Sequence, residues 1–180
     1  SSEAETLLPI QVPRKSRKRF ELYHRAQGST SIDVRIFDAD GNRVYDEPLK
    51  DSPASATWLV GVLGPTLAGL EKFSQVGNND IASLALRAED LPRKSWGLDA
   101  LDWLLWPEPD PQKLLPEQTE AVIEWVRSGG RLCLCVAKNV DLVNASPFAA
   151  LVPGRLERAQ PMADIEALWT LTKVPLPTLE

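Results

Sequence analysis

Residues 116–137, PEQTEAVIEWVRSGGRLCLCVA, decide the fold. Pro116 suits the first position of a helix, apolar side chains then recur at helical spacing, and Gly129-Gly130 ends the helix. Residues 132–137 follow as a continuous apolar run, which is typical of a strand covered on both faces. A helix that leads directly into such a strand predicts part of a parallel α/β sheet.

The stretches to either side extend this sheet. An apolar run at 57–63 precedes a helix that we expect over 65–76, because it begins with a proline, carries apolar residues at near-helical spacing and ends at a glycine. Further strands are expected at 81–87 and 101–106. Strands and helices in this order make right-handed parallel crossovers. Residues 56–180 are therefore expected to form an α/β domain with an open, mainly parallel sheet and helices on both faces.

The region before this domain has a different pattern. Residues 1–18 are polar and irregular, with a basic run at 14–19 that we interpret as a solvated lead-in rather than a phosphate or lipid contact. Residues 19–50 alternate apolar and polar side chains around turn sequences, which favours a small antiparallel β meander. The three strands are expected over 20–25, 31–37 and 43–46. Short helices are expected past the last sheet strand, at 147–152 and 163–171.

Two groups of potential metal ligands do not complete a site. Oxygen side chains recur at Asp38, Asp40 and Asn42, but Gly41 comes too early for a calcium loop and no Glu closes it, so a tight turn is the better interpretation. Cys133 and Cys135 would lie side by side on one strand, and the chain has a single histidine. Zinc sites need more ligands than this. We therefore expect no metal and no cofactor.

Composition limits the function further. The net charge of −5 disfavours nucleic acid and anionic lipid as partners. No apolar stretch reaches the ~18 residues that span a bilayer. The chain opens on Ser1 rather than Met, which favours a piece of a longer protein. Any membrane attachment is then expected only through segments outside this chain.

The layout of residues 90–137 resembles a known family. Leu91-Pro92, the run 97–102 before a strand, a helix ending in Gly-Gly and a buried strand are similar to class I glutamine amidotransferase-like domains. The resemblance covers about half of the chain and is closest to non-enzymatic or uncharacterised relatives, which often occur in bacterial membrane-attached proteins. It implies a flavodoxin-like fold and favours an extracytoplasmic, membrane-attached location, with the cytoplasm as the alternative.

The catalytic pattern of that family is not matched. Its enzymes place a nucleophilic cysteine in a sharp turn flanked by glycines, with a His and a Glu near the end of the domain. Cys135 lies here between Leu134 and Val136, and the only histidine, His24, precedes the resembling region. We therefore expect a small buried cysteine with a raised pKa, and we assign no catalytic residue.

Ligands of open α/β sheets bind beyond the carboxyl ends of the strands. Two of the loops there carry polar side chains: the proline-rich loop 106–111 and the turn at 138–139. Trp96, in a loop before the strand at 101–106, is the aromatic residue best placed for a partner surface, with packing against the core as the alternative. The ligand-binding candidates are Trp96, Trp106, Glu108, Asp110, Lys138 and Asn139.

Three hypotheses follow. The first is a non-catalytic interaction module, within a larger bacterial membrane-attached protein, that binds a protein partner. The second is an enzyme with a different site, such as a hydrolase that uses Glu108 and Asp110, or Cys135 without a histidine. The third is a domain that binds a small molecule between the loops around Trp96 and Trp106.

Overall fold

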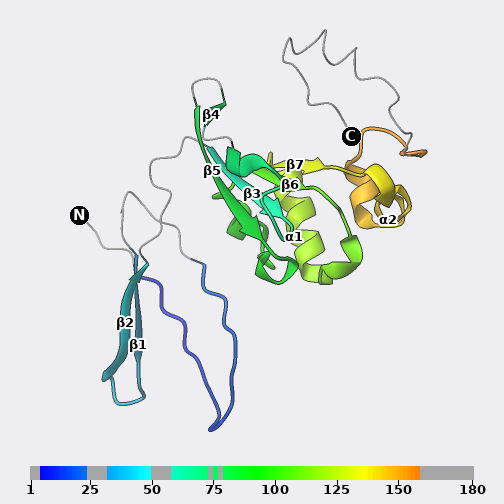
Figure 1. The fold of residues 1–180 in the computed structure, drawn as a ribbon. Coiled ribbons are helices and arrows are strands. Elements are labelled where there is room, and N and C mark those ends of the chain that lie inside the picture. Colours follow the sequence, from blue (N-terminus) through cyan, green and yellow to red (C-terminus); the bar gives the residue numbers. More distant parts are fainter. Residues whose placement is uncertain (1–4, 24–31, 50–57, 73–74, 77–78, 159–180) are drawn as a thin grey trace.

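The computed structural model describes residues 5–23, 32–49, 58–72, 75–76 and 79–158. Its centre is a sheet with the strand order β4-β5-β3-β6-β7 (Figure 1). All pairings among β5, β3, β6 and β7 are parallel, and the two-residue β4 pairs antiparallel with β5. The expected α/β fold with a mainly parallel sheet is confirmed. The strands are β3 (Trp58–Leu63), β4 (Gln75–Val76), β5 (Asn79–Leu86), β6 (Trp103–Trp106) and β7 (Arg131–Leu134).

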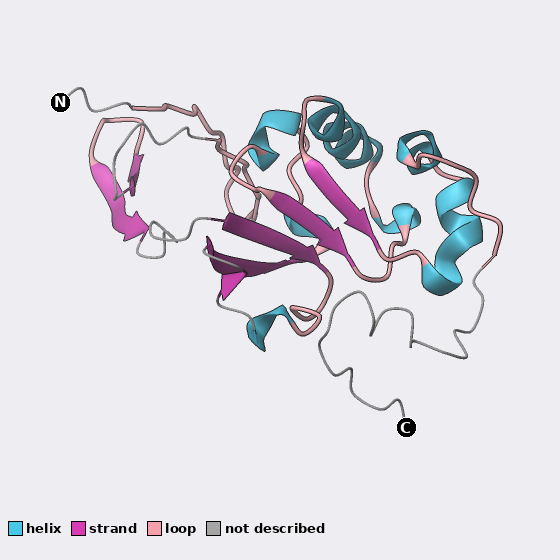
Figure 2. Cartoon of the chain, turned by 90° about the horizontal axis from the view of Figure 1, so that it is seen from above, coloured by secondary structure: helices cyan, strands magenta, loops and turns pink. Residues whose placement is uncertain are grey.

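The long α-helix lies on one face of this sheet, and the short one lies past the carboxyl end of β7 (Figure 2). Helix α1 spans Pro116–Arg127 as predicted, and α2 spans Val140–Asn144. The expected turn after α2 is present as η6, Pro147–Leu151. On the opposite side lies the single turn η1, Leu70–Lys72, in the connection from β3 (Figure 2). The helix expected over 163–171 lies outside the described residues.

The helix predicted over 65–76 is wrong. The described part of this connection contains only the turn η1 and the short strand β4. Ala68 and Gly69 have φ angles of 53° and 89°, and this left-handed backbone cannot continue an α-helix. The near-helical spacing of apolar residues in this segment was therefore not a sign of a helix, because Ala68 and Gly69 have left-handed backbone angles.

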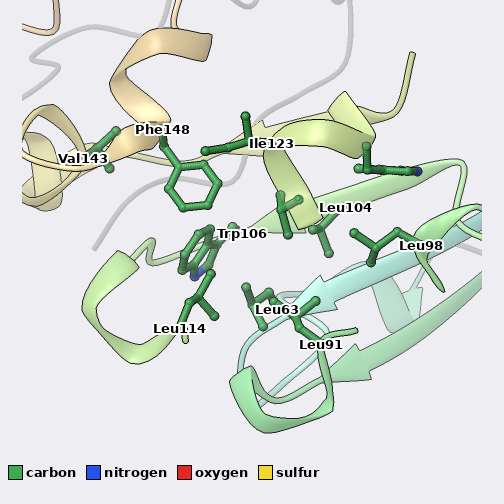
Figure 3. Packing of buried hydrophobic residues seen from close by; sticks show 11 residues of the cluster. Leu63, Leu91, Leu98, Leu104, Trp106, Leu114, Ile123, Val143 and Phe148 are labelled. Atoms are coloured by element: carbon green, nitrogen blue, oxygen red, sulfur yellow. The ribbon is translucent and has the colours of Figure 1, made fainter. Parts of the chain in front are cut away.

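The core fills the space between the sheet and α1 (Figure 3). Leu104 and Trp106 lie two positions apart in β6, so their side chains point to the same face of the sheet. Phe148 reaches the cluster from η6 and meets the Trp106 ring edge-on, with 5.5 Å between ring centroids. The side chains with no more than 1% of their surface exposed are Val62, Leu91, Leu98, Leu104, Val122, Val143 and Phe148.

Strand β7 is covered less completely than the sequence indicated. Leu132 and Leu134 point towards the core cluster and are partly buried, whereas Cys133 and Cys135 are exposed. The expectation that residues 132–137 form a strand buried on both faces is therefore wrong. The physical reason is that the core cluster lies against only one face of β7, so burial alternates along the strand. From Leu132 to Val136 the sequence alternates between larger apolar residues and cysteines, a period of two that fits a strand with one covered face.

The N-terminal part forms a two-stranded antiparallel hairpin of β1 (Ile32–Phe37) and β2 (Arg43–Leu49). The turn interpretation of its tip is confirmed, because an Asp38 carboxylate oxygen accepts the backbone N–H groups of Asp40 and Asn42. The strand predicted over 20–25 is wrong for residues 20–23, and residues 24–25 lie outside the described residues.

Residues 19–23 lie against the α/β domain instead. Arg19 forms an ion pair with Asp90, with 3.1 Å between Nη2 and Oδ1. The Tyr23 hydroxyl accepts the backbone N–H of Arg93 at 3.0 Å and donates to Glu21 at 2.9 Å. These long-range contacts explain why the segment does not join the hairpin.

Candidate functional site

The loops after β6 and β7 meet at the carboxyl edge of the sheet. The side-chain amide of Asn139 donates to the carbonyl oxygen of Pro109 at 2.9 Å. Nearby, the ammonium group of Lys138 lies 3.4 Å from a carboxylate oxygen of Glu108. The structure therefore brings together residues that are 30 positions apart in sequence, as expected from the parallel order of these strands.

The polar side chains at this edge already have partners within the chain. The side chains of Glu108 and Lys138 are 75% and 77% exposed, so water screens both charges. Asp110 accepts the backbone N–H of Gln112 at the start of the turn Pro111–Lys113, and its other oxygen lies 3.3 Å from Lys113. A carboxyl group that acts as a general acid or base is usually desolvated or placed beside another acid, which raises its pKa towards neutrality. These contacts fit a role in stabilising the loops better than a role in acid-base catalysis.

The two candidate tryptophans have different environments. Trp106 is only 4% exposed and belongs to the core, so it cannot present its ring to a ligand as we expected. Trp96 lies in the turn Ser95–Leu98, which precedes β6 rather than following it. Its ring is 55% exposed and meets the Tyr23 ring at 4.5 Å between centroids. The identified partner of Trp96 is thus a segment of its own chain.

Cys135 lies just past the end of β7, and its backbone N–H donates to the Trp106 carbonyl oxygen at 3.0 Å. Partial burial, together with the neighbouring Cys133, raises the pKa of the Cys135 thiol above its ordinary value. A raised pKa is the opposite of what activates a nucleophile. No histidine occurs among the described residues, because His24 lies outside them.

We expect both thiols to react with a thiol-specific reagent in the folded protein. At neutral pH the Cys135 thiol should react more slowly than a free thiol, because its raised pKa lowers the thiolate fraction, and the rate should increase as the pH rises. The rates are measured separately in the Cys133→Ser and Cys135→Ser variants. Reaction only after addition of denaturant would contradict the exposed position of the two cysteines.

A shallow hollow of about 300 Å³ lies at the amino ends of β6 and β7. Sequence reasoning missed it, because it considered only the carboxyl ends of the strands. Asp102 at this edge accepts the backbone N–H of Leu59 at 2.8 Å, and its own N–H donates to the Leu59 carbonyl oxygen. This carboxylate therefore joins two strands rather than facing a ligand. The lining residues are Asp99, Leu101, Asp102, Trp125, Ser128, Gly129, Gly130 and Arg131.

Neither a metal-binding cluster nor a membrane-spanning helix is found among the described residues. No three His, Cys, Asp or Glu side chains there gather closely enough to hold a metal ion. None of the helices in the same part of the chain has the length and apolar composition needed to cross a membrane. In comparisons with known proteins, no protein-family model, curated protein or solved structure matches the chain.

Proposed function

We propose that this chain is a non-catalytic, glutamine amidotransferase-like interaction module that belongs to a larger, membrane-attached bacterial protein and acts by binding another protein. The amidotransferase-like and membrane-attached parts of the proposal rest on the sequence resemblance of residues 90–137 and on their strand–helix–strand order. The interaction part rests on the surface of the hairpin.

The observation that carries the proposal is the apolar face of the β1–β2 hairpin. The register pairs Ile32 with Leu49, Val34 with Glu47 and Ile36 with Tyr45, so five apolar or aromatic side chains share one face with the Glu47 carboxylate. Leu49, Tyr45 and Ile36 are 56%, 44% and 39% exposed. An exposed cluster of large apolar side chains in a soluble protein marks an interaction surface.

The other face of the hairpin carries a cluster of charged side chains together with Val44, which is 61% exposed. Nη2 of Arg35 lies 3.1 Å from Oδ2 of Asp33, and Nε of Arg35 lies 3.7 Å from Oδ1 of Asp46. Nη1 of Arg43 lies 2.6 Å from the other carboxylate oxygen of Asp46. A two-stranded hairpin is marginally stable by itself, and it gains stability when its apolar face is covered. More of the apolar side chains lie on the Tyr45 face, which therefore favours a partner that covers this face.

The hydrolase alternative has less support. Glu108 is paired with Lys138, Asp110 caps a turn, and the raised pKa of Cys135 disfavours a thiolate. We expect the chain to release no ammonia from glutamine above the buffer rate, with the Cys135→Ser variant indistinguishable from the parent. Ammonia release that depends on Cys135 would contradict the non-catalytic part of the proposal.

Site-specific photo-crosslinking in the producing cell tests the interaction part. A photoreactive phenylalanine derivative replaces either Tyr45, on the apolar face, or Val44, which points to the opposite face and is 61% exposed. We expect discrete cross-linked products from position 45 and far fewer from position 44. Equal cross-linking from both positions, or none from position 45, would show that the apolar face is not covered. The membrane-attached part is tested by the complete reading frame, which should encode a spanning helix or a signal segment next to this module.

A further inference from the structure

We propose that β1 is a self-complementary edge that pairs antiparallel with β1 of a second copy of this chain and joins two hairpins into one four-stranded sheet. The inference rests on the proposed function and names the partner of the same hairpin. Within the described part of the chain, β1 pairs only with β2. Unpaired backbone N–H and C=O groups along such an edge are a template for another strand.

The two edges of the hairpin differ in what they permit. Strand β2 contains Pro48, which has no backbone N–H to donate to an added strand. Strand β1 has neither proline nor lysine, and its one irregularity lies between Ile36 and Phe37, at its end. Residues 32–36 therefore form a regular edge of five residues that, in the described part of the chain, pairs with no strand other than β2. Added strands are expected at β1 rather than at β2.

The sequence Ile32-Asp-Val-Arg-Ile36 is chemically the same when matched against its own antiparallel copy. With a twofold axis at Val34, each Val34 faces the other, and Ile32 faces the second copy's Ile36. On the opposite face Asp33 then lies across from the second copy's Arg35. Cross-strand partners have Cβ atoms roughly 5 Å apart, so apolar pairs form on one face and opposite charges meet on the other.

Shifting this register by one residue removes both kinds of match. Ile36 would then lie across from Asp33, and Val34 across from Arg35, which mixes the apolar face of one hairpin with the charged face of the other. The charge pattern therefore selects the register centred on Val34. Pairing in this register also extends the apolar face from two strands to four, and sheets with more strands are more stable than single hairpins.

Reversal of single charges tests the pairing. In Asp33→Arg two arginines face each other twice in the symmetric dimer, and in Arg35→Asp two aspartates do so. Each single variant is expected to weaken self-association by roughly tenfold or more. The double variant Asp33→Arg/Arg35→Asp restores opposite charges across the interface and is expected to return the dissociation constant to near the parent value. Asp40→Arg, at the hairpin tip, is the matched control for the change in charge and should leave it unchanged.

The measurement is the molar mass of the full chain in solution as a function of concentration, by analytical ultracentrifugation. Circular dichroism of each variant separates loss of pairing from loss of folding. A dimer that the single variants dissociate and the double variant restores supports the proposal. A monomeric parent chain, or a dimer indifferent to these charges, overturns it. Cross-linking from position 45 to a different protein would in that case leave the proposed function standing with another partner.

Discussion

Phe148→Ala is expected to lower the free energy of unfolding by about 3–5 kcal/mol, because the side chain has no exposed surface and its removal leaves a cavity beside Trp106. This is a large part of the stability of an ordinary domain, about 5–15 kcal/mol. Chemical denaturation followed by tryptophan fluorescence measures the change, and the edge-on contact with Trp106 provides a direct reporter.

The same substitution at Phe37 is the matched control. The Phe37 ring is 51% exposed on the hairpin, so Phe37→Ala is expected to change the stability of the α/β domain by less than about 1 kcal/mol. Equal effects of the two substitutions would contradict the position of Phe148 between α1 and the sheet.

Gln118→Met is expected to cost about 2–4 kcal/mol, although methionine has a similar size. The Gln118 side chain is only 3% exposed, and its amide donates to the carbonyl oxygens of Ala88 and Leu91, both at 2.8 Å. Its oxygen accepts the backbone N–H of Leu115 at 2.9 Å. Methionine would leave these backbone groups without a partner, and each buried group left unsatisfied costs roughly 1–3 kcal/mol before local relaxation.

The variant Gln118→Glu adds a pH dependence with a definite sign. Burial and two facing carbonyl oxygens disfavour the charged form, so the pKa of the introduced carboxyl should be higher in the folded than in the unfolded protein. The variant should therefore be less stable than the parent at about pH 7 and should recover relative to it as the pH falls to about 5. Glu117→Gln, at the exposed neighbouring position, is the control. A stability difference that does not change with pH would contradict the buried amide contacts of Gln118.

The sequence correctly predicted those elements that depend only on their own and directly neighbouring residues. Helix α1 begins at Pro116 and ends just before Ser128-Gly129, where the sequence placed its limits. The alternation in β1 and the turn at Asp38 were also readable, because each depends on neighbouring residues. The segment 65–76 was not, because the left-handed backbone at Ala68 is not encoded in a hydrophobic period.

The errors at the candidate site have a shared physical origin in long-range contacts. The sequence did not reveal that the Tyr23 ring packs against Trp96, across more than 70 residues of sequence, while Trp96 stays 55% exposed. Trp106 was assigned to a loop from its neighbouring prolines, yet Phe148 buries it. Cys135 was expected to be interior because its run is apolar, but the core cluster lies against only one face of β7, and Cys135 is exposed.

The central claim is that two copies of the chain pair through their β1 edges, and disulfide trapping tests this pairing most directly. In a Cys133→Ser/Cys135→Ser background, Val34→Cys places one thiol on the proposed twofold axis. Facing residues of paired strands have Cα atoms roughly 4.5–5.5 Å apart, within the range that a disulfide spans. We predict rapid formation of a covalent dimer from Val34→Cys under mild oxidation, and little from Val44→Cys at an exposed position of β2. If Val34→Cys stays monomeric, or dimerises no faster than Val44→Cys, the claim is wrong.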